Sequence, residues 1–437
     1  MEPDKKNMSR LATWIDGRPR AVLTIYAMLA AFTAYASMYA FRKPFTATGY
    51  EGMTAFTFAG VAFAYKPIAV IVQLLGYMSS KFIGIKVASE APLGRRVPLV
   101  LILIVLAEVA LLGFALVPAP YNLVFLFLNG LPLGMVWSLL FGVLEGRRVS
   151  EFLVLGMSVS VIFASGWVKG AGRWTMENWD ISPFWMPAVT GLLFVPLLLI
   201  SLGMLRHVPP PDDQDRKERT ERKPMNHAER RQFFRSYLPG VVFLVIGYLC
   251  LMAYRDLRDS FMDQILKELN HEVNSGTFVR IENWVGVIVI AALCFLWFFR
   301  KNRAAVWANA ILITTGALVL GVATLLLKQG LLSPTTFYIV NGVGLYIAFV
   351  PYQSIFMDRL LASLGTVATA SFLIAIADAY GYLSTVSLYL VRDIVSKFMG
   401  YELPWVSLLM VSSMVVMVAV PLSLCAAMLY FRPKLKD

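Results

Sequence analysis

FLFLNGLPLG, residues 125–134, lies within a long apolar stretch, and a similar segment, FYIVNGVGLY, follows at residues 337–346. Each segment carries an Asn-Gly pair inside a hydrophobic run, and the sequence numbers of Asn129 and Asn341 differ by 212. A likeness of this length is weak evidence of duplication by itself. It becomes informative when a second pair of segments shares the same offset.

Such a second pair exists at other places in the chain. MYAFRKPF, residues 38–45, resembles LMAYRDLRDSF, residues 251–261, and the numbers of Arg42 and Arg255 differ by 213. Because two independent likenesses have nearly one offset, the sequence predicts two homologous halves. The same alignment places one arginine at an equivalent position in each half.

The composition is that of an integral membrane protein. Of the 437 residues, 58% are hydrophobic and only 15% are charged, and the mean hydropathy is +0.67. Soluble domains carry roughly one quarter charged residues. The three cysteines all lie in apolar stretches, which is not the pattern of a disulfide framework.

Twelve stretches are apolar over about the 20 residues that a membrane-spanning helix needs. They are residues 21–48, 56–80, 97–117, 121–144, 152–170, 183–205, 237–258, 278–299, 304–327, 334–357, 366–390 and 402–430. The two duplicated pairs fall in spans one and seven and in spans four and ten. The expected fold is therefore an all-α membrane protein of twelve transmembrane helices, in two six-helix bundles related by a parallel pseudo-twofold repeat.

Five segments follow from this division. They are a cytoplasmic N-terminal tail (1–20), an N-terminal bundle (21–205), a charged cytoplasmic linker (206–236), a C-terminal bundle (237–430) and a cytoplasmic C-terminal tail (431–437). The linker is rich in proline and in charges of both signs and has no apolar face, which is typical of a solvated connection.

The distribution of cations predicts the orientation. With the N-terminus inside, 27 of the 39 Lys and Arg residues lie in the tails and in the loops on that side. The positive-inside rule therefore places both termini in the cytoplasm, and the expected location is a bacterial inner membrane. Much of the net charge of +12 then reflects topology, so no nucleic-acid partner is expected.

Motifs of enzymes, metal sites and cofactors are missing from the sequence. The three histidines, His207, His227 and His271, lie in polar loops without the spacing of metal ligands. There is no Gly-x-x-x-x-Gly-Lys-Ser/Thr loop, which argues against transport driven by ATP. We expect no enzymatic activity, no metal and no cofactor.

The spans, the central linker and the repeat together resemble the major facilitator superfamily over essentially the whole chain. YAFRKPF, residues 39–45, is also similar to the Tyr-x-x-Arg-Lys-Asn-Phe segment of organophosphate:phosphate antiporters, with Pro44 in place of the asparagine. YMSSKFIGIKV and YRDLRDSF resemble segments of uncharacterised bacterial membrane proteins related to the superfamily. The resemblance implies alternating access, and it implies that Arg42 and Arg255 bind substrate.

Two interpretations of these arginines remain open at the level of sequence. In the first, both side chains extend to the membrane interface and Arg255 pairs with Asp259 one turn later. In the second, Arg42 and Arg255 line one solvated cavity and hold a phosphate or carboxylate between two guanidinium forks. Lys43, Tyr39, Asn129 and Asn341 are then further candidates for substrate binding.

Three other charges lie within the predicted spans and are candidates for gating or coupling. Lys66 is predicted near the middle of span two and Asp378 near the middle of span eleven, and the superfamily architecture implies that these helices meet. An ion pair between them would be either a permanent lock or one that opens during transport. Glu108 in span three is either a helix-packing hydrogen-bond partner or a proton site.

The expected function is secondary active transport of a small organic anion, either a phosphorylated or a carboxylated metabolite. The expected partners are that substrate and the lipid bilayer, and a monomer is expected. Three alternatives remain: a proton-coupled carrier of sugars or cell-wall fragments, a membrane sensor without net transport, and a scaffold without a ligand.

Overall fold

The computed structural model describes residues 13–15, 17–90, 93–144, 150–209, 227–299, 301–366 and 370–436. Contacts divide the chain into two compact units. Unit 1 consists of Met1–Phe45 and Val72–Glu221, and unit 2 consists of Thr46–Ile71 and Arg222–Asp437. Residues 46–71, which the prediction placed in the N-terminal bundle, pack with unit 2.

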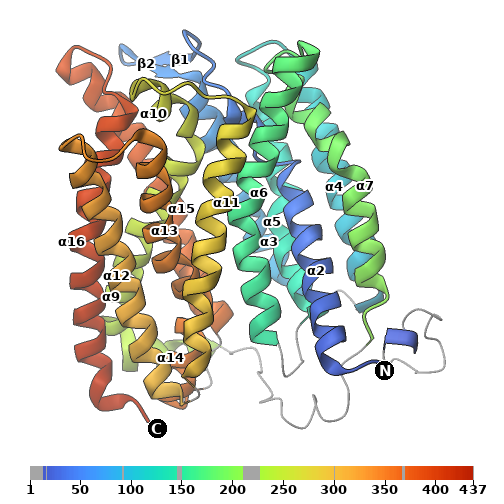
Figure 1. Cartoon of the computed structure of the whole chain (residues 1–437), viewed down its shortest axis with the longest axis vertical. Helices are drawn as coiled ribbons and strands as arrows, with labels where there is room; N and C mark the ends of the chain where they lie inside the picture. The colour runs from blue at the N-terminus through green and yellow to red at the C-terminus, as the bar shows by residue number, and fades with distance from the viewer. Residues whose placement is uncertain are drawn as a thin grey trace. The chain divides into compact units, whose positions relative to one another are not determined.

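Unit 1 is built from long helices (Figure 1). They are α2 (Arg20–Tyr39), α3 (Tyr65–Glu90, from Val72 onward), α4 (Leu93–Leu116), α5 (Leu123–Leu144), α6 (Ser150–Trp179) and α7 (Met186–Arg206). Helix α2 packs against α6 and α7, and α4 packs against α5 and α7. The division between the units falls inside α3, between Ile71 and Val72.

Unit 2 contains further long helices and several short elements. The helices are α9 (His227–Ser260), α10 (Met262–Glu268), α11 (Ser275–Cys294), α12 (Asn302–Lys328), α13 (Pro334–Pro351), α14 (Met357–Leu364), α15 (Ala370–Met399) and α16 (Trp405–Phe431). A π-helical turn, Tyr352–Phe356, joins α13 to α14. Helix α9 lies beside α15 and α16, and α12 lies beside α13 and α16.

Glycines allow close helix packing in both units. A Cβ atom on Gly130 of α5 would collide with the Gln73 carbonyl oxygen of α3. In unit 2, a Cβ atom on Gly316 of α12 would lie 2.5 Å from the Gly344 carbonyl oxygen of α13. Such contacts between backbones are typical of helices that associate in lipid. The hydrophobic effect does not drive association there, and small residues allow the close van der Waals packing that does.

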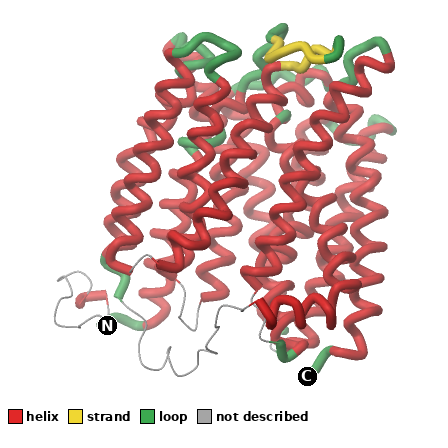
Figure 2. The backbone as a smooth tube through the Cα atoms, turned by 180° about the vertical axis from the view of Figure 1, so that it is seen from behind, coloured by secondary structure: helices red, strands yellow, loops and turns green. Residues whose placement is uncertain are grey.

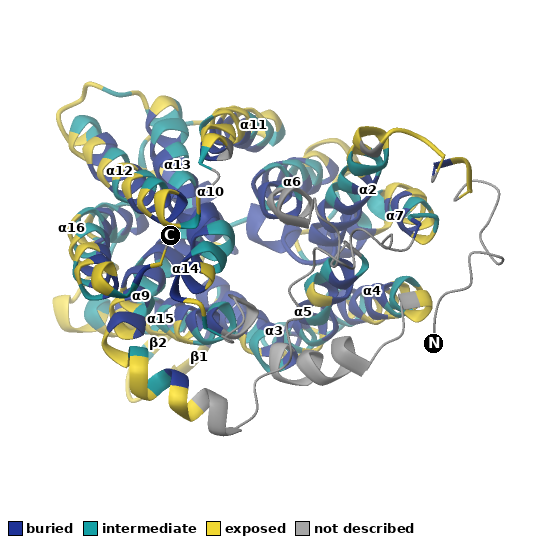
Figure 3. Cartoon of the chain, turned by 90° about the horizontal axis from the view of Figure 1, so that it is seen from below, coloured by how far each residue is buried: buried dark blue, intermediate teal, exposed yellow. Residues whose placement is uncertain are grey.

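Ten helices in the described part of the chain are long and apolar enough to cross a membrane. Large apolar side chains are exposed along them, such as Ile102 and Val109 of α4 and Val411 and Leu422 of α16. Figure 3 shows exposed residues on the outward sides of α12 and α16. Exposed apolar surface of this extent suits lipid as the solvent, so the protein is a multi-pass membrane protein. The helices α3 and α6 correspond to predicted spans two and five, and twelve crossings remain a prediction.

Two boundaries near the N-terminus differ from the prediction. Span one was predicted to reach residue 48, but α2 ends at Tyr39 and a 3₁₀ turn follows at Pro44–Ala47. Proline has no N–H to continue the helical ladder and disfavours helical backbone just before it. Arg42 and Lys43 therefore lie in a turn after the helix and not on it.

Span two was predicted from residue 56, but residues there form a hairpin, so the expectation of an all-α chain needs correction. Strand β1 (Thr54–Phe58) pairs antiparallel with β2 (Val61–Ala64), and α3 begins only at Tyr65. The two loop residues, Ala59 and Gly60, have φ angles of 50° and 73°, as a hairpin turn with two left-handed residues requires. Figure 2 shows the strands in yellow near the ends of helices.

The central polar segment is partly helical. Helix α7 ends at Arg206 and α9 begins at His227, inside the predicted linker 206–236. Residues 210–226 of that linker lie outside the described residues. The 34 residues of α9 measure about 51 Å at 1.5 Å per residue, which exceeds the roughly 30 Å hydrocarbon core.

Candidate binding sites in the two units

Arg42 is buried in unit 1 against aromatic rings. Its side chain is 5% exposed, and its guanidinium carbon lies 3.9 Å from the centroid of the Tyr77 ring on α3. The ring of Tyr39 lies at 5.8 Å from the same carbon. An arginine over the face of an aromatic ring gains cation–π attraction, most of all where water is excluded. Lys43 is likewise buried, with 7% of its surface exposed.

Asn129 of α5 holds the turn that carries Arg42. Its Nδ2 atom donates to the Phe41 carbonyl oxygen at 2.9 Å and to the Ala107 carbonyl oxygen of α4 at 3.0 Å. Gln73 of α3 donates to the Arg42 carbonyl oxygen at 2.9 Å and to Asn129 Oδ1 at 2.8 Å. The structure thus brings together Arg42 and Asn129, and it uses the asparagine to position the backbone beside the arginine.

Arg255 of unit 2 lies on α9 and is half-buried. Its guanidinium carbon is 4.6 Å from the centroid of the Phe349 ring on α13. Its Nη2 and Nε atoms donate to Asp256 Oδ1 at 2.7 and 3.1 Å. Thr385 of α15 donates to the other carboxylate oxygen of Asp256 at 3.1 Å. The first of the two sequence interpretations paired Arg255 with Asp259; the structure shows an ion pair of Arg255 with the adjacent Asp256.

Asn341 of α13 makes contacts that match those of Asn129. Its Nδ2 atom donates to the Tyr254 hydroxyl at 2.7 Å and to the Leu320 carbonyl oxygen of α12 at 3.4 Å. The sequence numbers of Ala107 and Leu320 differ by 213, and those of Phe41 and Tyr254 differ by the same amount. Each asparagine therefore links the residue before the arginine to the equivalent place on a neighbouring helix.

An aromatic pair repeats in the same way. In unit 1 the rings of Tyr35 and Trp137 lie edge to face with their centroids 4.9 Å apart. In unit 2 the rings of Tyr248 and Phe349 lie 5.6 Å apart. The two tyrosines differ in number by 213, and Trp137 and Phe349 differ by 212. Each unit thus carries an arginine, an asparagine and an aromatic pair at equivalent positions, which supports the predicted duplication.

Lys66 and Asp378 have separate partners. Lys66 is the second residue of α3, and its Nζ atom donates to the Thr46 carbonyl oxygen at 2.9 Å and to Gln264 Oε1 at 2.6 Å. Asp378 accepts a hydrogen bond from Tyr248 at 2.5 Å.

The positions of these two charges in unit 2 correct the predicted pair. Lys66 lines the same cleft as Arg392 of α15, and Asp378 precedes Arg392 by about four turns of that helix, on the order of 21 Å. Because the hairpin occupies the start of predicted span two, Lys66 lies at the end of α3 and not at mid-span. The two charges are therefore at different levels, and a direct pair between them was a wrong prediction.

Glu108 of α4 is buried in unit 1. A Cβ atom on Gly191 of α7 would collide with Glu108 Oε2, and it would lie 3.0 Å from the Phe41 ring. Among the described residues, neither carboxyl oxygen of Glu108 has a hydrogen-bond partner. The carboxyl group thus lies between α4 and α7, beside the segment that leads to Arg42, and the predicted packing hydrogen bond is not observed.

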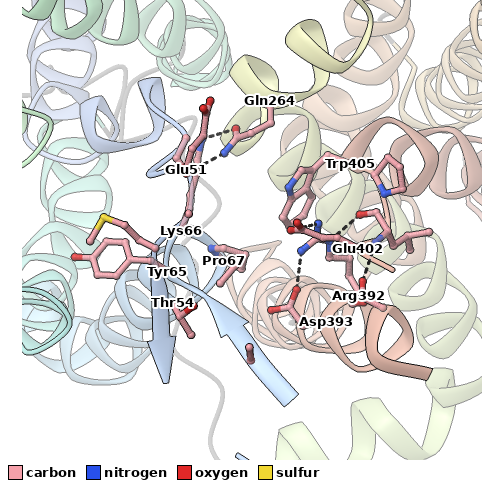
Figure 4. Close-up of a pocket in the computed structure, with 18 of the residues that line it drawn as sticks. Glu51, Thr54, Tyr65, Lys66, Pro67, Gln264, Arg392, Asp393, Glu402 and Trp405 are labelled. Atoms are coloured by element: carbon pink, nitrogen blue, oxygen red, sulfur yellow. Dashed lines mark hydrogen bonds and ion pairs between the residues drawn. The ribbon is translucent and has the colours of Figure 1, made fainter. Parts of the chain in front are cut away.

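A cleft of about 900 Å³ opens within unit 2, where the hairpin segment meets α10, the end of α15 and the start of α16. Figure 4 shows Arg392 between Asp393 and Glu402 on one side of the cleft, at N–O distances of 2.8 and 2.9 Å. Lys267 pairs with Glu51 at 2.9 Å and with Asp263 at 3.1 Å. Burial lowers the pKa of Lys267, but these two carboxylates outweigh it and raise the pKa above its ordinary value.

A family model covers nearly all of this architecture. The model of a family of unknown function, DUF5690, matches residues 44–434. The chain belongs to the DUF5690 family. No curated protein matches the sequence.

Solved structures with the fold of this DUF5690 protein are membrane transporters. A bacterial homologue of the human lysosomal transporter Spinster, in an inward-facing unoccupied conformation, has 13% identity and a TM-score of 0.61 and covers 95% of this chain and 99% of its own. A mutant of the peptide transporter POT, in complex with alafosfalin, has 14% identity and a TM-score of 0.60, with 100% of both chains covered. The nucleoside transporter NupG has 13% identity and a TM-score of 0.61 and covers 92% of this chain and 98% of its own. At these identities the likeness shows the fold alone.

The DUF5690 chain also has a buried ion pair that the sequence analysis missed. Arg258 of α9 donates to Glu282 of α11 at 2.8 Å, and the two side chains are 1% and 0% exposed. A second nitrogen of Arg258 donates to the Tyr338 carbonyl oxygen of α13 at 2.9 Å. The available signal was an acidic residue, Glu282, within predicted span eight, together with the cation Arg258 at the end of span seven.

Proposed function

We propose that this DUF5690 protein is a secondary active transporter that moves a small organic anion by alternating access. The observation that carries the proposal is the repeated arrangement of an arginine beside an aromatic ring in each unit, Arg42 with Tyr77 and Arg255 with Phe349. In a fold of two homologous halves, equivalent residues can serve one substrate from two sides. Each guanidinium group is then a proposed ligand of the transported anion.

The contacts of Arg255 support a carboxylate or a phosphate as the recognised group. Two nitrogens of its guanidinium already bind one carboxylate oxygen, that of Asp256. A substrate anion would take the place of this internal carboxylate and gain the geometry that an arginine fork provides. In the empty carrier Asp256 would neutralise Arg255, and Thr385 would hold Asp256 when the substrate displaces it.

The other predicted residues receive supporting roles. Asn129 and Asn341 position the segments beside the two arginines, Tyr39 contributes a ring to Arg42, and Lys43 adds a second buried cation. The preferred substrate is a phosphorylated or carboxylated metabolite, exchanged for phosphate. The excess of cations on one side supports both termini in the cytoplasm. The proposed carrier is a bacterial inner-membrane protein that acts as a monomer.

Counterflow in proteoliposomes tests this function. Vesicles loaded with inorganic phosphate should take up labelled phosphate or a labelled phosphorylated metabolite, because the second substrate drives the exchange. Vesicles with the same protein but no internal phosphate are the control. Binding of these anions without flux would indicate a sensor, and the absence of both binding and flux would indicate a scaffold. Either result contradicts the proposal.

Glu108 favours a second candidate, a proton-coupled carrier of sugars or cell-wall fragments. An isolated carboxylate without donors is expensive to bury, and binding a proton removes that cost. Its position beside Phe41 places it next to the segment of Arg42. A proton could therefore be gained or lost as this segment moves.

Replacing Glu108 with glutamine separates the two candidates. In a proton-coupled carrier, Glu108→Gln should lower uptake driven by an imposed pH gradient at least tenfold while leaving counterflow near its original rate, because the amide cannot exchange a proton. The measurement is uptake of a labelled substrate at equal and at unequal pH. Glu177→Gln, in an exposed pair with Arg173, is the matched control. If a pH gradient drives no uptake in the unaltered protein, proton coupling is wrong.

A further inference from the structure

One segment of the chain belongs to a different unit from both of its flanks. Residues Thr46–Ile71, here named the strap, pack with unit 2, whereas Phe45 before it and Val72 after it belong to unit 1. The strap contains the hairpin and the first turns of α3. The strap is therefore covalently continuous with unit 1 at both of its ends, while its own contacts are with unit 2.

The base of the strap is bound to α10. The buried Lys66 Nζ atom donates to Gln264 Oε1 at 2.6 Å, and Gln264 Nε2 donates to the Gly49 carbonyl oxygen at 3.5 Å. Lys267 reaches the strap through its ion pair with Glu51 at 2.9 Å. Two residues of the strap's first loop, Gly49 and Glu51, thus contact a single short helix.

The tip of the strap is bound to the end of α15. Strand β2 packs against α15, and the Lys397 ammonium group donates to the Ala59 carbonyl oxygen in the hairpin turn. A Cβ atom on Gly60 would lie 3.1 Å from the Lys397 Nζ atom. The turn therefore presents its backbone to a cation from unit 2.

The contacts of the strap are polar and lie around an open cleft. The cleft is bordered by strap residues such as Thr54 and Lys66 on one side and by residues of α15 and α16 on the other. Figure 4 shows Lys66, Glu51 and Gln264 together on the strap side, facing Arg392 and Trp405. Glu51 is 73% and Lys267 40% exposed in their ion pair. Exposed ion pairs are individually weak, so the Glu51–Lys267 pair suits a connection that opens and re-forms.

We propose that the strap is a latch that holds one conformation of the transporter. In that conformation the strap is bound to unit 2, as observed. When unit 1 moves relative to unit 2, the strap follows unit 1 and breaks the contacts of Lys66, Lys267 and Lys397. The inference rests on the proposed alternating access, because the contacts of the strap would break only if the two units move relative to each other.

Reversible cross-linking of the strap tests the latch. In a variant with Cys250, Cys294 and Cys425 replaced by serine, Glu51→Cys and Lys267→Cys are joined by a short bis-methanethiosulfonate reagent that dithiothreitol removes. The matched control is Arg173→Cys with Glu177→Cys, an exposed i,i+4 pair on α6 within unit 1. Both cysteine pairs can be joined by the same reagent, but only the pair at positions 51 and 267 attaches the strap covalently to α10.

The first readout does not depend on a substrate. Keto-reactive spin labels on unnatural residues at Trp179 of unit 1 and Leu331 of unit 2, both exposed, report the distance between the units. We expect two distance populations before cross-linking, one after it, and two again after reduction, with the control pair unchanged. A single population before cross-linking, or two populations that persist after it, would overturn the latch.

The second readout is phosphate counterflow. Cross-linking the strap should reduce the rate at least tenfold, and reduction should restore it. If counterflow is absent from every sample but the distances respond as expected, the proposed substrate fails and the latch stands. If counterflow continues at full rate with the strap cross-linked, the latch is wrong whatever the substrate.

A variant at the tip of the strap gives a test without any cross-linker. Lys397→Met removes the cation at the hairpin turn and should shift the two distance populations toward the state lost on cross-linking. An unchanged ratio of the two populations would also count against the latch.

Discussion

Arg255→Lys should reduce phosphate counterflow by roughly 30-fold or more, while the protein still folds and inserts. A hydrogen bond to a charged group is worth about 1.5–3 kcal/mol, and each 1.4 kcal/mol is about tenfold. Lysine keeps the charge but has neither the planar fork that binds two acceptors nor the flat face that stacks on Phe349. The measurement is the initial rate of counterflow at equal amounts of reconstituted protein.

Arg42→Lys should have a similar effect, since the guanidinium of Arg42 stacks on Tyr77 at 3.9 Å. Arg173→Lys is the control, because Arg173 lies in a partly exposed pair with Glu177. Asp256→Asn gives an independent check: it removes the internal carboxylate from Arg255, so phosphate should bind more tightly in a thermal-shift titration. Undiminished counterflow in both lysine variants would exclude the two arginines as the anion site.

The helical architecture was predictable because hydropathy reports directly on the solvent around a helix. Spans such as α4, α12 and α16 are uniformly apolar over most of their length and need no knowledge of their neighbours. The sequence also predicts a duplication, because Asn129 and Asn341 recur with the arginines at nearly one offset. Asn129 and Asn341 donate hydrogen bonds to the carbonyl oxygens of Ala107 and Leu320, which differ in number by nearly the same offset.

The hairpin was missed because its composition imitates a membrane span. TAFTFAGVAFA, residues 54–64, is apolar enough to merge with the helix after it. The decisive features are local: two aromatic residues alternate in β1, and Ala59-Gly60 takes a left-handed turn. Because hydropathy alone assigned these residues to a helix, Lys66 was placed at mid-span and given the wrong partner.

The hydrogen-bond partners of the two asparagines and of Arg258 could not be predicted from the sequence, for a different reason. Whether an amide binds a ligand or a backbone carbonyl depends on which helix lies beside it, and Asn129 meets the Phe41 carbonyl only through the packing of α5. Gly342 shows the same dependence, since its lack of a Cβ makes room for the Arg258 guanidinium. The spacing of residues along the chain predicts neither the contact of Asn129 with Phe41 nor that of Gly342 with Arg258.

The Arg258–Glu282 pair gives the largest expected effect on stability. Glu282→Gln should lower the free energy of unfolding by about 3–5 kcal/mol, because it leaves the Arg258 cation buried without its counterion. Arg258→Met should do the same by leaving the carboxylate of Glu282 uncompensated. The measurement is reversible unfolding of the purified protein in mixed micelles, followed by circular dichroism.

The double variant distinguishes the cost of an unpaired charge from a net contribution of the pair. Arg258→Met with Glu282→Leu replaces both ions by apolar groups of similar size, and such replacements are often neutral or stabilising. We therefore expect it to recover most of the stability that either single change removes, apart from about 1 kcal/mol for the hydrogen bond to the Tyr338 carbonyl oxygen. A double variant as unstable as the sum of its two single variants would show that the ions act independently, and the buried pair would then not be the element that joins α9 to α11.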